Sequence, residues 1–206
     1  MWTIVVGGGS GARFGGPKQL EVIGSQRMID LAVAVARNCS DGVVAVVPAG
    51  TTDPVPRADA VVTGGATRSA SVRSGLAAVP SEVAVVVVHD AARPLATESL
   101  FRAVIDAVRA GADAAIPGLP VADTLKRVEG DRVADTVDRR DLVQVQTPQA
   151  FRARALRDAH ATEAEATDDA ALVEAAGGRV VVVAGDARNL KITTPDDLAI
   201  ARALLR

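Results

Sequence analysis

The amino-acid sequence predicts an α/β protein built on a doubly wound, mostly parallel sheet. Short apolar runs rich in β-branched residues recur along the chain and alternate with longer helical patterns. The apolar runs are continuous, which is typical of strands buried on both faces of a parallel sheet. Regular alternation of strands and helices then favours a doubly wound domain.

The expected elements can be placed in order along the chain. Strands are expected at residues 3–6, 43–47, 60–63, 83–88, 113–117 and 180–184. Helical patterns cover residues 26–38, 67–79, 97–111 and 167–178. A last helix begins at Pro195, with Thr194 as its N-cap and two aspartates in its first turn. The 206 residues suit one domain, residues 1–206.

Residues 119–146 interrupt this alternation. They consist of short, charged, extended pieces around Glu129-Gly130-Asp131, a pattern that predicts an antiparallel hairpin. The segment is too charged to pack as core, so we expect it to project from the sheet as a β-arm. Both a dimer contact and a solvated surface hairpin fit this pattern.

Composition excludes several classes of protein. A net charge of −2 and a chain with three Phe, one Trp and no Tyr argue against a nucleic-acid partner. A single cysteine allows neither an internal disulfide nor a thiolate metal cluster. No apolar run approaches the roughly 20 residues that span a bilayer, and the N-terminal residues do not resemble a signal peptide. We therefore expect no membrane association and a cytoplasmic location.

The stretch GGGSGARFGGPKQ, residues 7–19, is the strongest local signal. Its six glycines free backbone N–H groups to approach an anion, and Arg13 and Lys18 add positive charge. A Walker A loop is excluded because Pro17 occupies the lysine position, and the dinucleotide fingerprint fails at Phe14. Pro17 favours an extended segment at Lys18. A triphosphate cradle is predicted, with a plain flexible loop as the alternative.

This loop resembles the G-x-G-x-R…P-K signature of sugar-phosphate nucleotidyltransferases. Further stretches narrow the resemblance to the 2-C-methyl-D-erythritol 4-phosphate cytidylyltransferase family of the non-mevalonate isoprenoid pathway. In chain order they are TGGATRSASV (63–72), VVVHDAARP (86–94), VADTLKR (121–127), TVDRRDLVQVQTPQAF (136–151), TDDAALVE (167–174) and NLKITTPDDL (189–198).

The resemblance implies a Rossmann-like domain, a homodimer built by the β-arm, and Mg²⁺-dependent transfer of CMP from CTP to a polyol phosphate. It gives catalytic roles to Arg13, Lys18 and Lys191. It implies nucleotide contacts from Gly7, Gly8, Gly9, Gly11, Gly65, Ser71, Asp90 and Ala91, with Asp90 also binding the metal. It assigns the polyol phosphate to Arg93, Thr124, Arg139 and Thr147, of which Thr124 and Arg139 would reach into the other subunit's site.

The chemistry of such a transfer agrees with the residues present. An attacking phosphate is already anionic near pH 7, so fixed cations and a metal are needed more than a general base. His160 follows a helix and is expected at the surface, whereas His89 is expected to make a structural hydrogen bond. Asp90 follows an expected strand and is the better candidate for binding ribose hydroxyls or hydrated Mg²⁺.

Some positions depart from the family pattern. Ala66 stands where a base-facing aspartate is common, and Gly7 and Gly8 stand in a loop that usually reads P-A-A-G. Two alternatives stay open: a cytidylyltransferase acting on ribitol 5-phosphate, and a catalytically silent nucleotide-binding domain. The silent domain is the weaker one, because Arg13, Lys18 and Lys191 are all present.

Overall fold

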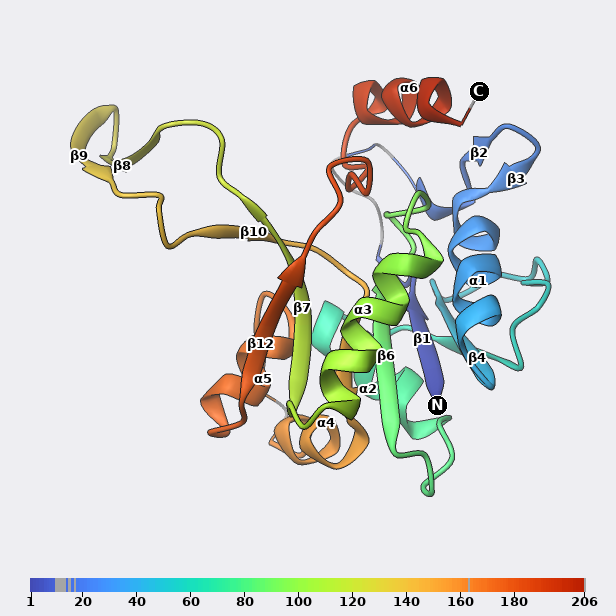
Figure 1. Cartoon of the computed structure of the whole chain (residues 1–206). Coiled ribbons are helices and arrows are strands. Elements are labelled where there is room, and N and C mark those ends of the chain that lie inside the picture. Colours follow the sequence, from blue (N-terminus) through green and yellow to red (C-terminus); the bar gives the residue numbers. More distant parts are fainter. Residues whose placement is uncertain (10–13, 15, 17, 163, 206) are drawn as a thin grey trace.

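A computed structural model describes residues 1–9, 14, 16, 18–162 and 164–205. In that part of the chain the central sheet has eight strands (Figure 1). The strands are β1 (Trp2–Val6), β4 (Gly42–Val47), β5 (Ala60–Thr63), β6 (Val85–Asp90), β7 (Ala114–Pro120), β10 (Val143–Val145), β11 (Gln149–Arg152) and β12 (Val180–Ala184). Their order in the sheet is β10-β7-β11-β6-β1-β4-β5, and β12 pairs with β7.

The sheet is mostly parallel, as the sequence predicts. β1 pairs in parallel with β4 and β6, β4 with β5, and β12 with β7. The exceptions are β10 and β11, which run antiparallel to their neighbours. β11 lies between β6 and β7, where the sequence pattern predicts no strand.

Helices cover both faces of the sheet, and the central strands β1, β4 and β6 bury side chains on both sides. α1 (Met28–Cys39) and α3 (Glu98–Arg109) pack on the face that carries Val5. α2 (Arg68–Ala77), α4 (Ala153–His160) and α5 (Asp169–Ala175) pack on the opposite face, which carries Ile4. Neighbouring residues of β1 thus belong to two different hydrophobic clusters, which defines a doubly wound α/β domain.

The two ends of the chain meet in a third, smaller cluster. α6 (Pro195–Leu204) places Leu198 and Ala201 against Ile23 and Met28. Ile23 belongs to a small hairpin of β2 (Val22–Ile23) and β3 (Gln26–Arg27), which follows the 3₁₀ helix η1 (Lys18–Leu20). Lys18 therefore begins a helical turn, and the extended conformation expected from Pro17 is wrong. Pro17 itself lies outside the described residues.

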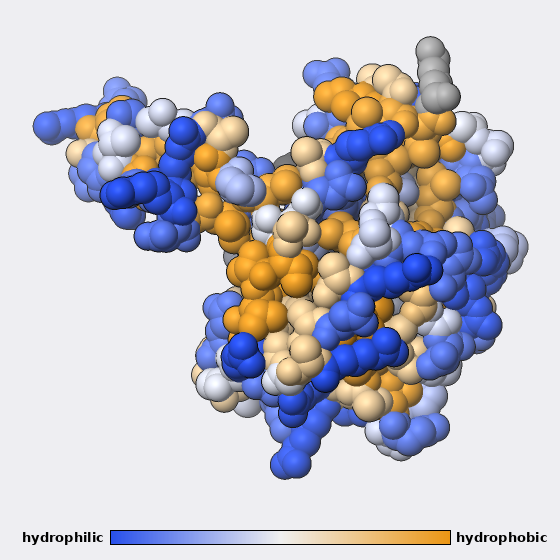
Figure 2. All heavy atoms as spheres, in the orientation of Figure 1, coloured by the Kyte–Doolittle hydropathy of each residue, from blue (hydrophilic) through white to orange (hydrophobic). Residues whose placement is uncertain are grey.

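The predicted β-arm is present and projects from the sheet (Figure 1). β8 (Leu125–Glu129) and β9 (Arg132–Val137) form an antiparallel hairpin that turns at Gly130, whose φ is 63°. Such a positive φ favours glycine because it lacks a Cβ atom. The hairpin side chains are mostly exposed, and polar residues dominate its visible surface in Figure 2. Among the described residues, no helix combines the length and hydropathy needed to cross a membrane.

Candidate functional site

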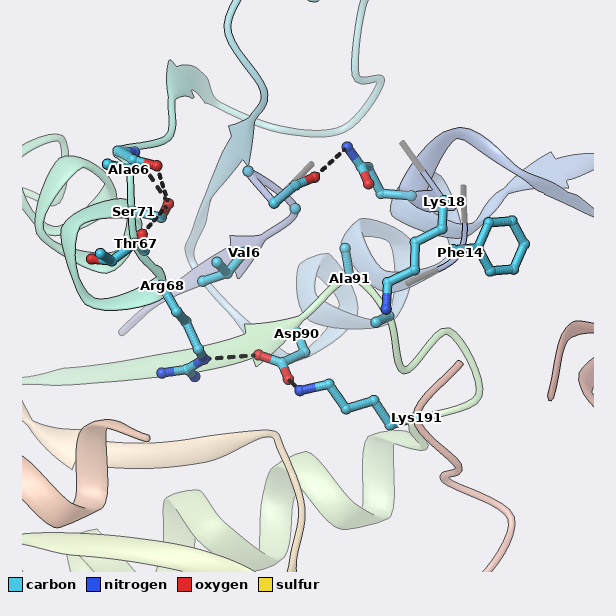
Figure 3. A pocket seen from close by; sticks show the side chains of 16 residues that line it. Val6, Phe14, Lys18, Ala66, Thr67, Arg68, Ser71, Asp90, Ala91 and Lys191 are labelled. Atoms are coloured by element: carbon cyan, nitrogen blue, oxygen red, sulfur yellow. Dashed lines mark hydrogen bonds and ion pairs between the residues drawn. The ribbon is translucent and has the colours of Figure 1, made fainter. Parts of the chain in front are cut away.

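A pocket of about 520 Å³ opens at the carboxyl ends of β1 and β6 (Figure 3). Ligands bind at this edge in open α/β sheets, because loops from neighbouring strands converge there. We call this cavity the strand-end pocket. Its lining residues are Val6, Gly7, Gly8, Gly9, Phe14, Lys18, Gln19, Gly65, Ala66, Thr67, Arg68, Ser71, Asp90, Ala91, Ala92 and Lys191.

Two glycine loops make close contact on one wall of the pocket. A Cβ atom on Gly8 would lie 3.1 Å from the Cα of Gly64 and 3.1 Å from Ser71 Oγ. A Cβ atom on Gly65 would lie only 2.4 Å from the Cβ of Ala70. Ser71 fixes the second loop by accepting a hydrogen bond from the Gly65 N–H at 3.1 Å and donating to the Thr67 carbonyl at 2.9 Å. This wall can therefore present backbone groups to a small planar ligand.

Asp90, the last residue of β6, lies between two cations in the pocket (Figure 3). Its Oδ2 accepts from Lys191 Nζ at 2.8 Å, and its Oδ1 contacts Arg68 Nε at 3.4 Å. Burial alone would raise the pKa of Asp90, but the charges of Arg68 and Lys191 hold this pKa well below its usual range. The carboxylate therefore stays ionised at neutral pH.

Lys18 joins the N-terminal loop to the C-terminal segment. Its Nζ donates to the Ile192 carbonyl at 2.7 Å, next to Lys191 in the chain. Gln19 makes a second tie, because its Nε2 contacts the Gly9 carbonyl at 3.4 Å. Two lysines from opposite ends of the sequence thus reach one cavity, an arrangement suited to an anionic ligand.

The charged cluster continues behind the pocket into the protein interior. Arg68 Nη1 donates to Asp169 Oδ2 at 2.7 Å, and His160 Nε2 lies 2.9 Å from Asp169 Oδ1. His160 is only 5% exposed, so the surface position expected for it is wrong. It is the last residue of α4, and its imidazole turns inward toward the buried start of α5.

His89 has the structural role expected from the sequence. Its Nε2 donates to the Arg93 carbonyl at 3.2 Å, and its Nδ1 accepts from Thr147 Oγ1 at 3.1 Å. Complete burial lowers the pKa of His89 to about 4, so the imidazole is neutral at physiological pH. Thr147 Oγ1 also accepts from the Asp90 N–H at 3.0 Å and so connects His89 to the pocket wall.

The pocket gathers most of the residues assigned to catalysis and nucleotide binding. Those that line it are Lys18, Lys191, Gly7, Gly8, Gly9, Gly65, Ser71, Asp90 and Ala91. The predictions for Arg13 and Gly11 lie outside the described residues.

The residues assigned to the polyol phosphate do not line the pocket. Arg93 is buried and donates to the carbonyls of Asn189, at 2.7 Å, and Val145, at 3.3 Å. Thr147 is also buried. Thr124 and Arg139 lie exposed on the β-arm.

Sequence reasoning missed Arg68, which contributes a cation to the pocket. Arg68 is the first residue of α2, whose N-cap Thr67 accepts a hydrogen bond from the Ala70 N–H. It stands in the same TGGATRSASV stretch as Gly65 and Ser71, which is the signal that could have identified it. Its partners lie 22 and 101 residues away in the chain, so their contacts become visible only in the fold.

Asp90 is the carboxylate of the strand-end pocket lining that could contact a Mg²⁺ ion bound together with a nucleotide. Among the described residues, no group of three or more His, Cys, Asp or Glu side chains could hold a metal ion. Mg²⁺ commonly uses one or two carboxylates together with water and substrate phosphates. One ionised carboxylate in a pocket suited to phosphates meets that requirement.

A doubly wound fold with a glycine-walled, lysine-bearing pocket at its strand ends defines a nucleotidyltransferase type of α/β protein. The family model for "IspD: 2-C-methyl-D-erythritol 4-phosphate cytidylyltransferase" matches residues 1–206. The chain belongs to this family, as its sequence motifs predict.

Known relatives agree with this assignment. The chain is 42% identical over 220 residues to the 2-C-methyl-D-erythritol 4-phosphate cytidylyltransferase of Salinibacter ruber, covering 99% of this chain and 92% of that protein. It is 46% identical over 222 residues to a bifunctional IspD/IspF enzyme of Clavibacter michiganensis, covering all of this chain but 54% of that longer protein. The crystal structure of the Thermus thermophilus cytidylyltransferase superposes with a TM-score of 0.88 at 37% identity, covering 98% of both chains.

Proposed function

We propose that this protein transfers CMP from CTP to 2-C-methyl-D-erythritol 4-phosphate and releases pyrophosphate. The observation that carries the proposal is the strand-end pocket, in which Lys18, Lys191 and Asp90 meet beside a glycine wall. Relatives named for this acceptor support the same reaction and do not favour ribitol 5-phosphate.

The chemistry follows from the charges in the pocket. A phosphate oxygen of the acceptor forms a bond to the α-phosphorus of CTP, and the bond from that phosphorus to the bridging oxygen breaks. The acceptor oxygen is already anionic near pH 7, because the second pKa of a phosphate monoester is about 6. Lys18 and Lys191 would offset the repulsion between the two anions and the charge that grows in the transition state.

Asp90 is the residue that would hold Mg²⁺ in this reaction. A bound Mg²⁺ would supply further positive charge to the phosphate oxygens. Asp90 itself would stay ionised, because Arg68 and Lys191 keep its pKa low.

The β-arm supports the proposal of a homodimer. Thr124 and Arg139 point to solvent within one chain, although the resemblance assigns them to the acceptor. The arm and its base also expose apolar side chains, including Val128 at 60% and Val143 at 40% exposure. In a two-fold dimer, an arm from each subunit would cover these side chains and reach the other pocket. The reaction would run in the cytoplasm, which stays a prediction.

The test is a pyrophosphate-release assay that crosses four nucleotides with two acceptors. We expect the highest kcat/KM for CTP with methylerythritol phosphate, and UTP should be the best of the wrong nucleotides. Each buried polar group left unpaired by the wrong base costs about 1–3 kcal/mol, so the glycine wall can discriminate between pyrimidines. A preference for ATP or GTP, or for ribitol 5-phosphate, would contradict the proposal.

A variant at position 66 tests whether the pocket wall formed by the two glycine loops contacts the base. Ala66 lines the pocket without a polar side chain, whereas an aspartate there could accept a hydrogen bond from the amino group of cytosine. Ala66→Asp should therefore increase the ratio of kcat/KM for CTP to that for UTP. An unchanged ratio would show that position 66 does not face the base.

A further inference from the structure

Asp169 and His160 contact each other behind the strand-end pocket without lining it. The Asp169 side chain is fully buried and that of His160 is 2% exposed. The ion pair between Asp169 and Arg68 is a poor source of stability, because desolvation of the buried carboxylate offsets much of the attraction between the charges. We therefore ask which side chain the Asp169 carboxylate orients.

The pair orients Arg68. Both carboxylate oxygens of Asp169 are used: Oδ2 accepts from Arg68 Nη1 at 2.7 Å, and Oδ1 faces His160 Nε2 at 2.9 Å. With its tip held in this way, Arg68 turns its Nε toward Asp90, 3.4 Å away, as Figure 3 shows. The short contact with Asp169 anchors the guanidinium in the interior, and the longer contact with Asp90 lies on the pocket side.

Asp90 thus has two partners of different character. The Arg68 side chain is 23% exposed and is tied into the interior, whereas that of Lys191 is 40% exposed and bound at 2.8 Å to the other oxygen of Asp90. A substrate phosphate entering the pocket competes with Asp90 for Lys191. The Asp90 side chain is only 10% exposed. If Lys191 left and no other cation were present, the Asp90 carboxylate would be a buried charge without a partner, which is costly.

We propose that Asp169, backed by His160, is a positioning residue that fixes Arg68 beside Asp90, so that Lys191 can move from Asp90 to a substrate phosphate. This inference rests on the proposed function, since it assigns further residues to the same site. Arg68 is the permanent counter-ion of Asp90, and Lys191 is the exchangeable one.

The first test compares kcat/KM of three variants with that of wild type. Asp169→Asn should lower kcat/KM for CTP by about 10- to 100-fold, the usual effect of losing a residue that orients a ligand-binding group. Arg68→Met should lower it at least as much. The double variant Asp169→Asn/Arg68→Met should be no worse than Arg68→Met alone, because Asp169 acts through Arg68.

Arg73→Met is the matched control. Arg73 lies on the same helix and forms an ion pair with Glu165 at 2.9 Å, but its contacts do not lead to Asp90. Its loss removes a comparable link between α2 and the segment before α5. We expect kcat/KM for CTP to stay within about twofold of wild type, as for surface changes in general.

A second readout does not depend on activity. In ¹⁵N-labelled protein, the Arg68 Nε–H resonance should be protected from solvent exchange, and Arg68→Lys identifies it by its disappearance. Asp169→Asn should remove that protection, while Arg73→Met should retain it.

The outcomes separate failure of this inference from failure of the proposed function. If wild type does not transfer CMP, the proposed function fails, and the resonance still tests whether Asp169 fixes Arg68. The inference is overturned if wild type is active and folded Asp169→Asn keeps normal kcat/KM or a protected Arg68 resonance. Should Asp169→Asn fail to fold, Arg68→Lys decides: it keeps the charge but cannot contact both carboxylates, so normal kcat/KM would contradict the inference.

Discussion

Lys18 and Lys191 lie in the same pocket but are held differently. Lys18 donates to a backbone carbonyl, that of Ile192, whereas Lys191 is paired with the Asp90 carboxylate. When Lys191 leaves Asp90, Arg68 remains as the cation beside that carboxylate. Recruitment of Lys191 by a triphosphate should therefore depend on Arg68.

We expect Lys18→Ala to abolish most of the turnover while leaving the fold intact. Removing a fixed cation from a site where charge develops lowers the rate by on the order of 10²-fold or more. The measurement is kcat with saturating CTP, together with the thermal unfolding midpoint. Arg102→Ala is a suitable control, since Arg102 is an exposed cation on α3 paired with Glu98. A near-normal kcat for Lys18→Ala would show that Lys18 has no catalytic role.

At the scale of elements, α6 depends on its first turn. Thr194 and Asp197 form a capping box, and Asp197 Oδ2 accepts from Thr193 Oγ1 at 2.7 Å and from the Thr193 and Thr194 N–H groups at 2.8 Å. These bonds, led by that from Thr193 Oγ1, lower the pKa of Asp197 to about 2. The cap fixes the helix directly after the segment that carries Lys191.

Asp197→Asn should destabilise the protein at neutral pH by about 1 kcal/mol, the usual value of an N-terminal cap. The folded-state pKa lies below the usual 3.8, so the stabilisation is present above pH 4 and is lost as pH falls toward 2. Denaturant unfolding between pH 7 and pH 2 should thus show the difference from wild type shrinking below pH 4. Asp196→Asn, in the same turn, should change the free energy of unfolding less than Asp197→Asn does. An equal change for the two variants would attribute the effect to the lost charge alone.

At the scale of the whole molecule, the β-arm is a mostly exposed segment that projects from the sheet (Figure 1). Thr124 and Arg139 are exposed on it and do not line the strand-end pocket of their own chain. A projecting hairpin with exposed apolar side chains is suited to contact with a second copy. If the proposed dimer forms, each site contains residues from both subunits.

Subunit mixing tests this arrangement. Lys18→Ala and Arg139→Ala proteins should each be inactive, but a mixed dimer has one site with both residues intact. Random exchange should restore about a quarter of wild-type activity, because half of the dimers are mixed and each has one intact site. Mixing either variant with itself is the control. No recovery in verified mixed dimers would show that the arm serves its own subunit or that Arg139 is outside the site.

Much of this architecture is predictable from sequence, because local patterns determine it. Continuous apolar runs identify buried parallel strands, and the turn at Gly130 identifies the hairpin. β11 escapes prediction because its four residues, QAFR, are too few to show a period. The inward turn of His160 also escapes, since its partner Asp169 belongs to a different helix.

The residues of the site, too, fall into those that the sequence predicts and those that only the fold reveals. Glycine loops and the lysine positions follow from motifs. The pairing of Arg68 with Asp90 and Asp169 depends instead on how α2 packs on β1 and β4 and α5 packs on β7 and β12. Such contacts between distant residues leave no local pattern in the sequence. They are set by tertiary packing, which a single sequence does not display.

The bond between Lys18 and the Ile192 carbonyl spans 174 positions of the chain, and this separation matters during biosynthesis. The last strand of the central sheet ends at Ala184, so a ribosome completes every described strand before it adds Lys191. Without the segment after β12, Lys18 lacks the Ile192 carbonyl and the strand-end pocket lacks Lys191. A chain truncated after Ala184 should therefore keep the strands of the sheet but lose nucleotide turnover, as limited proteolysis and pyrophosphate release would measure. Formation of the sheet and completion of the pocket are thus separable.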